Sequence, residues 1–144
     1  MKHKAGIIGY GNMGSWHAEN VNSRIDDLEV VCVYDIDPER QKLAEENGLK
    51  VYSSAEELLA SDIDIVIIAT PNNYHKYYSI LAMESGKNVV CEKPACMNCE
   101  ELEEVIAVSE KTGKLYTVHQ NRRFDSDYAK MKEIIDRDML GKLF

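Results

Sequence analysis

Three glycines near the N-terminus have the spacing G-x-G-x-x-G and lie between an apolar run and the start of a helix. Gly9 permits a tight turn, Gly11 lets the backbone approach a pyrophosphate, and Gly14 lets the helix pack closely on the strand. The helix N-terminus then offers free N–H groups to the phosphates. A plain glycine-rich turn is the alternative, but this context favours a dinucleotide site. The loop residues expected to line it are Gly9, Tyr10, Gly11, Asn12, Met13 and Gly14.

An aspartate, Asp35, ends the next strand-like run, at the distance from the glycines that a dinucleotide site requires. Its carboxylate would accept hydrogen bonds from the adenosine ribose hydroxyls and repel a 2′-phosphate, so NAD is favoured over NADP. A helix-capping role is the alternative, but Asp37 fills that role before Pro38. Ile36 is expected beside the cofactor. Arg40 tempers the preference for NAD, because an arginine pairs readily with a 2′-phosphate.

The stretch "ATPNNYHKYY" follows the fourth strand-like run and supplies a second group of polar residues. Pro71 fixes the backbone, Thr70, Asn72 and Asn73 offer short polar groups, and His75 falls near the start of the next helix. Loops at the carboxyl ends of parallel strands form the ligand crevice of such folds. A polar turn that merely caps the following helix explains the same residues equally well.

A lysine, Lys93, stands between a glutamate and a proline directly after the apolar run "NVVC". At the carboxyl end of a fifth parallel strand its ammonium would face the nicotinamide side of the crevice. There it would orient a substrate hydroxyl and stabilise the oxyanion that develops as hydride leaves. A surface ion pair with Glu92, worth under about 1 kcal/mol, remains an equal alternative from the residues alone.

Six apolar runs of strand length recur along the chain, several of them too continuous to have a solvent-facing side. They cover residues 5–9, 29–35, 50–53, 64–70, 88–92 and 114–120. Helix signals lie between them, with Asp37, Ser54 and Asn98 as N-caps. This alternation predicts a doubly wound α/β fold, a mainly parallel six-stranded Rossmann sheet flanked by helices.

Composition excludes several classes of partner. The chain has 144 residues, a net charge of −8 and a charged fraction of 29%, which suits one globular domain and argues against a nucleic-acid partner. The longest apolar runs fall short of the roughly 20 residues that a membrane helix needs, and a cytoplasmic location is expected. Cys96 and Cys99 have the spacing of half a metal or redox site, but no second Cys/His pair completes it, so no metal is expected.

The motifs in this order, "GYGNMG", "YDID", "TPNNYH", "CEKP" and "HQNRRF", resemble the glucose–fructose oxidoreductase and inositol dehydrogenase family (Gfo/Idh/MocA) over essentially the whole chain. The resemblance implies that Lys93 lies close to the nicotinamide and the substrate. It also implies that other motif residues line the cofactor, the last two as alternatives at the nicotinamide end: Thr70, Pro71, Asn72, His75, Glu92 and Asn121 or Arg122.

Family members carry a second domain that forms the substrate floor, often the oligomer interface, and supplies the histidine assigned to proton transfer. His75 and His119 belong to other motifs and cannot be mapped onto that histidine. The resemblance therefore predicts a dinucleotide-binding domain over 1–122. Residues 123–144 would form a helix and the start of a connection to a C-terminal domain that this chain lacks. The helix, expected over 125–139, would fold back on the sheet or expose an apolar face.

The expected function is that of the nucleotide-binding portion of an NAD-dependent dehydrogenase acting on CH–OH groups. Hydride would pass between the nicotinamide and a sugar, polyol or related hydroxyl compound. The chain by itself is expected to be inactive, and any homo-oligomer would form through the absent domain. The alternative is a free-standing NAD(H)-binding or sensing module without catalysis.

Overall fold

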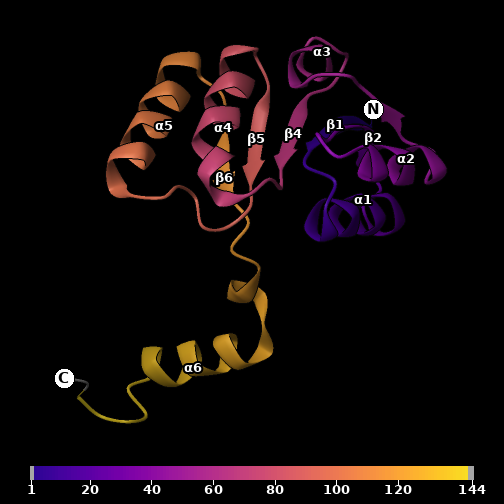
Figure 1. Cartoon of the computed structure of the whole chain (residues 1–144). Helices are drawn as coiled ribbons and strands as arrows, with labels where there is room; N and C mark the ends of the chain where they lie inside the picture. Colours follow the sequence, from indigo (N-terminus) through magenta and orange to yellow (C-terminus); the bar gives the residue numbers. More distant parts are fainter. Residues whose placement is uncertain (1, 143–144) are drawn as a thin grey trace.

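Strands and helices alternate along residues 2–142, the part of the chain that the computed structural model describes (Figure 1). The strands are β1 (His3–Ile8), β2 (Leu28–Tyr34), β3 (Lys50–Val51), β4 (Ile65–Ile68), β5 (Asn88–Cys91) and β6 (Tyr116–Val118). The α-helices are α1 (Asn12–Arg24), α2 (Pro38–Glu46), α3 (Ala55–Leu59), α4 (His75–Glu84), α5 (Cys99–Thr112) and α6 (Ser126–Asp136). Two 3₁₀ segments are η1 (Asn72–Tyr74) and η2 (Asn121–Phe124).

The six strands form one sheet in the order β3-β2-β1-β4-β5-β6, and every neighbouring pair is parallel. The chain builds outward from β1 to β3 and then returns to place β4 on the other side of β1. Ile7 therefore lies opposite Val33 of β2 on one side and Ile67 of β4 on the other. The predicted doubly wound fold is confirmed, and its strand order reverses between β1 and β4, where such sheets bind their ligands.

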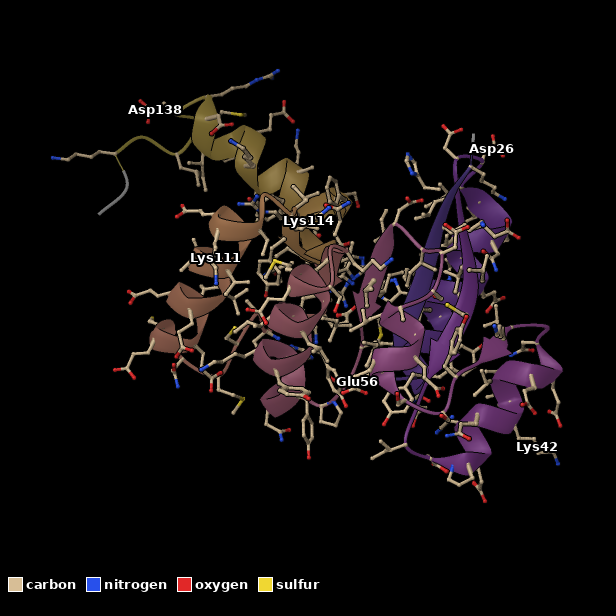
Figure 2. The ribbon with its side chains drawn as sticks, turned by 90° about the horizontal axis from the view of Figure 1, so that it is seen from above. Asp26, Lys42, Glu56, Lys111, Lys114 and Asp138 are labelled. Carbon is tan, nitrogen blue, oxygen red and sulfur yellow. The ribbon has the colours of Figure 1, made fainter. Side chains whose placement is uncertain are left out.

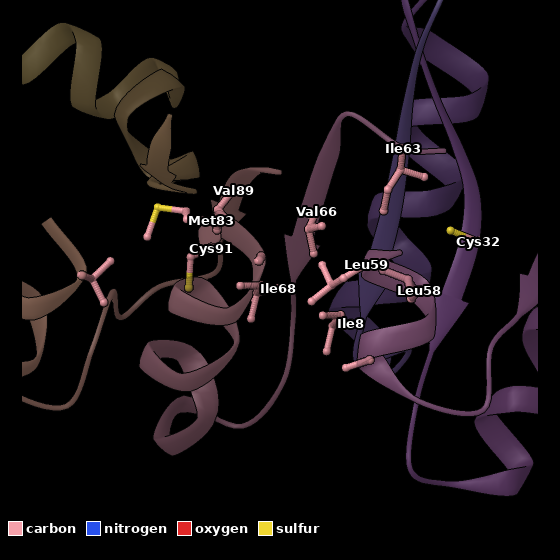
Figure 3. Packing of buried hydrophobic residues seen from close by; sticks show 13 residues of the cluster. Ile8, Cys32, Leu58, Leu59, Ile63, Val66, Ile68, Met83, Val89 and Cys91 are labelled. Carbon is pink, nitrogen blue, oxygen red and sulfur yellow. The ribbon is translucent and has the colours of Figure 1, made fainter. Parts of the chain in front are cut away.

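Both faces of the sheet are buried, which explains the continuous apolar runs. Successive residues of β1 point to opposite faces: Ile7 packs in the cluster formed with α1 and α2, whereas Ile8 packs in the cluster formed with α3, α4 and α5. Figure 3 shows the second cluster, in which Ile8 lies near Leu58 and Leu59 of α3. Charged side chains, among them Lys42 of α2 and Lys111 of α5, lie on the outside of the helical layers (Figure 2).

The predicted N-caps are confirmed. The side chains of Asp37, Ser54 and Asn98 each accept a hydrogen bond from a backbone N–H in the first turn of the helix that follows. The capping box at Ser54 is only half formed, because the Glu57 carboxylate accepts from the backbone N–H and hydroxyl of Ser53 instead of reaching back to Ser54. Local sequence thus determines where these helices begin.

The edge strands are shorter than the apolar runs that predicted them. β3 covers only Lys50–Val51 of the expected 50–53, and β6 covers only Tyr116–Val118 of the expected 114–120. Each pairs with a neighbour on one side alone, β3 with β2 and β6 with β5. The central strand β4 is shortened as well, to Ile65–Ile68 of the expected 64–70, so a run of β-forming residues overestimates strand length in both positions.

The apolar face of α6 has no cover within the described residues. Tyr128, Met131 and Ile135 are 37%, 56% and 53% exposed. The helix ends at Asp136 and not at 139 as expected, so Met139, 62% exposed, lies beyond it. α6 packs mainly on η2, and Figure 1 shows it at a distance from the sheet. Of the two expected outcomes for this helix, the structure has the exposed apolar face. None of the described helices combines the length and the low charge that crossing a membrane requires.

The positions of α6 and the sheet predict a contrast in stability. Ile135→Ala in α6 should change the free energy of unfolding by less than about 0.5 kcal/mol, because the side chain is already half exposed. Ile68→Ala removes a side chain that is 0% exposed and should cost about 2–5 kcal/mol. Urea unfolding followed by circular dichroism measures both. Equal losses in the two variants would show that α6 packs on the sheet.

Candidate functional site

A cleft of about 360 Å³ opens at the carboxyl ends of the central strands, where the strand order reverses. Loops after β1, β2 and β4 form its walls, and one side is closed by the first turns of η1 and α4. Its lining residues are Ile8, Gly9, Gly11, Tyr34, Asp35, Ile36, Asp37, Arg40, Ala69, Thr70, Pro71, Tyr74 and Tyr78. The cleft therefore brings together residues from three of the motifs singled out in the sequence.

The glycine loop has no room for side chains at two of its three glycines. Gly9 has a φ of 94°, and a Cβ there would lie 2.7 Å from the carbonyl oxygen of Ala69. A Cβ on Gly14 would collide with the carbonyl oxygen of Gly9, since helix and strand cross at this point. A Cβ on Gly11 would meet nothing within 4 Å, because Gly11 faces the open cleft. The loop thus packs tightly on the protein side and leaves space on the ligand side.

Helix α1 begins directly at this loop and has no side-chain cap at its N-terminus. Its first N–H groups are therefore available to an anion. Asn12 and Met13 are exposed on this first turn. Tyr10, which sequence reasoning placed beside the cofactor, is 1% exposed, and its hydroxyl oxygen accepts a hydrogen bond from Asn47 Nδ2 at 3.1 Å. Its side chain lies in the core on the α1 and α2 face, so only its backbone reaches the loop.

Asp35 stands at the end of β2 in the wall of the cleft. Its Oδ2 accepts from the backbone N–H of Tyr10 at 2.5 Å, and its Oδ1 accepts from the backbone N–H of Asp37 at 2.9 Å. Each carboxylate oxygen can still accept a second hydrogen bond. These contacts fix the carboxylate against the glycine loop. Ile36 is 80% exposed beside it, and Arg40 lines the same end of the cleft.

The loop after β4 contributes Thr70 and Pro71 to the opposite wall. The Thr70 hydroxyl oxygen is buried and has no hydrogen-bond partner among the described residues. Asn72 is exposed and opens η1. Sequence reasoning missed the tyrosines of this wall. Tyr74 and Tyr78 are spaced as helix neighbours, and their side chains could have been recognised as one face next to a candidate loop.

His75 lies behind this loop and does not line the cleft. It is 1% exposed, its Nδ1 lies 2.7 Å from the carbonyl oxygen of Pro94, and its Nε2 lies 3.0 Å from the carbonyl oxygen of Thr70. The imidazole therefore bridges the loop after β4 and the loop after β5. Sequence reasoning expected His75 beside the cofactor, whereas the structure places it where it holds two loops together.

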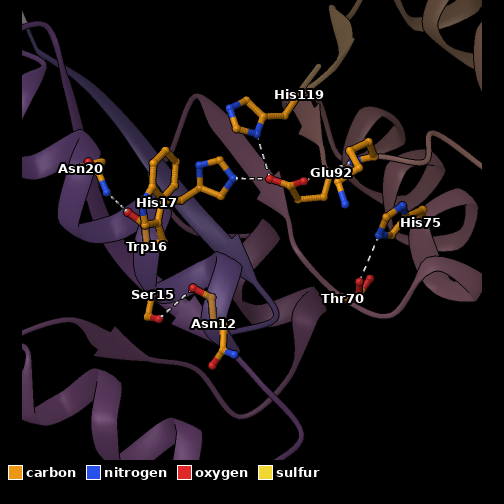
Figure 4. A network of polar contacts seen from close by, with 10 residues as sticks. Asn12, Ser15, Trp16, His17, Asn20, Thr70, His75, Glu92 and His119 are labelled. Carbon is orange, nitrogen blue, oxygen red and sulfur yellow. Dashed lines mark hydrogen bonds and ion pairs between the residues drawn. The ribbon is translucent and has the colours of Figure 1, made fainter. Parts of the chain in front are cut away.

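Glu92 follows β5 and is 5% exposed. Figure 4 shows one oxygen of its carboxylate facing two imidazoles from other elements. His17 Nε2, in α1, lies 2.7 Å from Glu92 Oε1, and His119 Nδ1, after β6, lies 2.9 Å from the same oxygen. Glu92 Oε2 accepts from the backbone N–H of Lys93 at 3.2 Å. Sequence reasoning did not assign His17 to the site, although its place one turn after the glycine loop puts it near the strand ends.

Burial and hydrogen bonding shift the pKa values of Glu92 and His17. Burial alone would raise the pKa of Glu92, but hydrogen bonds from His17 and His119 outweigh it and hold the pKa below the ordinary 4.5. Burial lowers the pKa of His17 below the ordinary 6.5; the hydrogen bond to Glu92 opposes this and the nearby His119 adds to it. At neutral pH the cluster therefore consists of an ionised carboxylate that accepts from a neutral His17.

Lys93 is exposed on the loop that Glu92 begins. The alternative role for Lys93, a surface ion pair with Glu92, is not formed. The Glu92 carboxylate is buried against the histidines and contacts only the backbone N–H of Lys93. Asn121 and Arg122 are exposed in η2, and Arg122 Nη1 pairs with Asp125 Oδ2 at 2.8 Å. Lys93, Asn121 and Arg122 thus lie beyond the lining of the cleft.

The cleft fits a dinucleotide on several independent features. Gly11 leaves open space where a pyrophosphate would approach the backbone, and the uncapped start of α1 supplies N–H donors next to it. Asp35 offers acceptors for ribose hydroxyls on the β2 side. The buried Thr70 hydroxyl supplies a polar group for a ligand on the β4 side. These residues would hold the adenosine and pyrophosphate of NAD.

Comparison with known proteins agrees with this geometry. Residues 3–120 match the Gfo/Idh/MocA family model, described as an oxidoreductase family with an NAD-binding Rossmann fold. An NAD-binding protein from Listeria innocua is 44% identical with a TM-score of 0.93, over 100% of this chain and 43% of that chain. Myo-inositol 2-dehydrogenase from Thermotoga maritima is 31% identical over 96% of this chain and 42% of its own length.

A third relative has been solved with its ligands. Scyllo-inositol dehydrogenase from Lactobacillus casei, with bound NAD(H) and scyllo-inositol, is 27% identical with a TM-score of 0.89, over 99% of this chain and 43% of that chain. The chain thus spans less than half the length of the relatives that it matches.

The lowered pKa values of His17 and Glu92 predict how stability depends on pH. Both groups bind protons less readily in the folded than in the unfolded chain, so unfolding takes up protons in this range. Their contribution is fully present above about pH 6.5 and is lost as the pH falls through the lowered pKa of His17 and then of Glu92. The melting temperature should therefore fall between about pH 7 and about pH 4.

The variant His17→Gln should flatten the upper part of this profile, since glutamine does not titrate. The control is His3→Gln, at an exposed histidine that contacts the Asp64 carboxylate. Because the Lys4 backbone N–H and this contact lower the pKa of Asp64, the variants are compared above about pH 5, where the slope due to His17 should remain. Melting curves measured by circular dichroism at intervals of pH decide between them. A wild-type slope no steeper than that of His17→Gln would show that His17 does not resist protonation.

Proposed function

This chain belongs to the Gfo/Idh/MocA oxidoreductases as an NAD-binding Rossmann domain, and on that basis we propose that it serves a dehydrogenase acting on a sugar, polyol or related hydroxyl compound. The observation that carries the proposal is the cleft at the switch point, where Gly11, Asp35 and Thr70 meet around open space. The named activities of the Thermotoga maritima and Lactobacillus casei relatives support a polyol as substrate.

The two ends of the cofactor follow from the geometry of the cleft. Asp35 on the β2 side would accept from the adenosine ribose hydroxyls, and the start of α1 would hold the pyrophosphate. The remaining half then extends across β4 toward the end of β5, where Lys93 stands. Bound NAD supplies the acceptor for a hydride.

In this arrangement Lys93 is the catalytic residue of the described chain. As an ammonium it donates a hydrogen bond to the substrate oxygen and stabilises negative charge that develops there as hydride leaves the carbon. An ammonium has no lone pair with which to accept the hydroxyl proton, so a base must come from another group. We place that base in the half of the relatives' length that this chain does not match.

The domain boundary, location and partners are proposed on the same basis. Residues 1–122 are proposed as the dinucleotide-binding domain, with Asn121 or Arg122 near the nicotinamide end, and 123–144 as a helix and the start of a connection to a further domain. Among the described residues, the position of α6 apart from the sheet supports this division. The net charge of −8 supports a protein without a nucleic-acid partner, and apolar runs too short for a membrane helix support a cytoplasmic location. Any homo-oligomer would form through residues outside the matched region.

The first test of this proposal uses Gly11→Ala. A methyl group there would point into the open cleft and meet no protein atom within 4 Å, so the melting temperature should stay within about 2 °C of wild type. The same methyl group would stand in the path of the pyrophosphate, and the affinity for NADH should fall at least about tenfold. Fluorescence titration of NADH measures the loss. Unchanged affinity for NADH would show that the pyrophosphate does not bind at this loop, and would contradict the proposed function.

The second test concerns cofactor choice. Wild-type protein should bind NADH at least about tenfold more tightly than NADPH, because the Asp35 carboxylate repels a 2′-phosphate. Asp35→Asn should narrow this gap, whereas Asp26→Asn, at an exposed aspartate before β2, should leave it unchanged. Tighter binding of NADPH by the wild type would contradict the role of Asp35. If Arg40→Ala then lost the affinity for NADPH, Arg40 would be the residue that selects the 2′-phosphate.

A further inference from the structure

Three titratable side chains from distant parts of the chain meet at the carboxyl ends of β5 and β6. His17 comes from the second turn of α1, Glu92 follows β5 and His119 follows β6. The side chains of His17 and Glu92 are each 7% exposed, and that of His119 is 27% exposed. The two imidazole rings pack edge to face with their centroids 4.7 Å apart. The cluster is therefore a built feature of the interior.

Hydrogen bonding explains why the carboxylate is tolerated there. A buried ionised carboxylate is costly unless it is well hydrogen-bonded, and Glu92 Oε1 accepts from both rings at 2.7 and 2.9 Å. The three candidate ligand atoms also lie within 4.8 Å of one another, as a metal site would require. Ring nitrogens that already donate an N–H to the carboxylate cannot ligate a metal without losing that proton. The contacts therefore favour a hydrogen-bonded cluster of His17, Glu92 and His119, called the clamp below.

The clamp acts on the segment that carries Lys93. Glu92 Oε2 accepts from the Lys93 backbone N–H, and His75 binds the carbonyl oxygen of Pro94 from the opposite face of the sheet. These two contacts hold the backbone on either side of the Lys93–Pro94 peptide bond. Lys93 itself is exposed. Histidines on both faces of the sheet thus fix the backbone of one exposed lysine.

The clamp also connects helix α1, which begins at the glycine loop of the cleft, with the loop after β5. Helix α1 offers its N-terminus to the pyrophosphate, and one turn further on its His17 reaches Glu92. Oε1 of Glu92 is occupied by the two histidines, whereas Oε2 holds a single, longer contact and keeps capacity for another donor. A sugar hydroxyl from the far half of a dinucleotide is a donor of the right kind.

We propose that His17 and His119 are positioning residues for the nicotinamide half of the cofactor, acting through Glu92 and the backbone of Lys93. The proposal rests on the proposed function, because it assigns that half of NAD to the end of β5. It predicts that two histidines outside the cleft lining raise the affinity for the nicotinamide half of NAD. The adenosine and pyrophosphate end, held by Asp35 and the glycine loop, should not depend on them.

The test compares two ligands that share one half. ADP carries the adenosine and pyrophosphate of NADH but lacks the nicotinamide ribose. In His17→Leu and His119→Leu the affinity for NADH should fall about tenfold, as expected for a lost hydrogen bond to a charged group, while the affinity for ADP stays within about twofold. His17→Gln and His119→Asn keep an N–H donor near Nε2 and Nδ1 and should recover most of the loss. His3→Gln is the matched surface control.

A second readout needs no ligand. Hydrogen exchange at the Lys93 amide should accelerate in both leucine variants and return toward wild type in His17→Gln and His119→Asn, while the amides of β1 keep their protection. Melting curves show whether each variant folds. If His17→Leu does not fold, the His119 variants still test the proposal, because the His119 side chain is partly exposed.

The outcomes separate the two proposals. Equal losses for NADH and ADP would reduce the clamp to general support of α1 and overturn the positioning role. Unchanged NADH affinity and unchanged Lys93 exchange in the leucine variants would overturn it as well. If the wild-type protein bound ADP and NADH no more tightly than Gly11→Ala does, the proposed function would be contradicted. Hydrogen exchange at the Lys93 amide would still show whether the histidines fix that peptide.

Discussion

The buried carboxylate of Glu92 is the constraint on which the arrangement of this end of the sheet depends. An ion in the interior is tolerated only when hydrogen bonds replace its water, and here those donors come from α1 and from the end of β6. The requirement ties three elements together that do not follow one another in sequence. It also fixes where the chain leaves β5, and therefore where Lys93 stands.

The parallel sheet makes such a meeting possible. All six strands run the same way, so every loop that follows a strand opens at the same edge. The reversal of strand order between β1 and β4 separates the adjoining loops and leaves a cleft instead of a packed surface. Asp35, the glycine loop and Thr70 line this cleft, and Glu92 and Lys93 follow β5, beyond its lining. The parallel topology therefore brings the proposed cofactor-binding residues and the proposed catalytic lysine to the same edge of the sheet.

Sequence patterns predicted what depends on local chemistry and burial. Continuous apolar runs predicted strands covered on both faces, and Asp37, Ser54 and Asn98 predicted helix starts, because capping involves neighbouring residues. Tyr10 was expected to line the ligand as part of the glycine loop, and its side chain lies in the core, since a position within a loop motif does not reveal which way a side chain points. The contact of His17 with Glu92 depends on how α1 crosses the sheet, which no local pattern contains. The contacts of His75 with the loops after β4 and β5 depend on tertiary packing in the same way.

The orientation of the cofactor is the most direct test of this account, and a crystal structure of the protein grown with NADH would measure it. The account predicts the adenosine ribose at the Asp35 carboxylate, the pyrophosphate over Gly11 and the start of α1, and the nicotinamide ribose on the side of Glu92 and Lys93. A cofactor bound in the opposite direction, or outside the cleft at the strand ends, would contradict it.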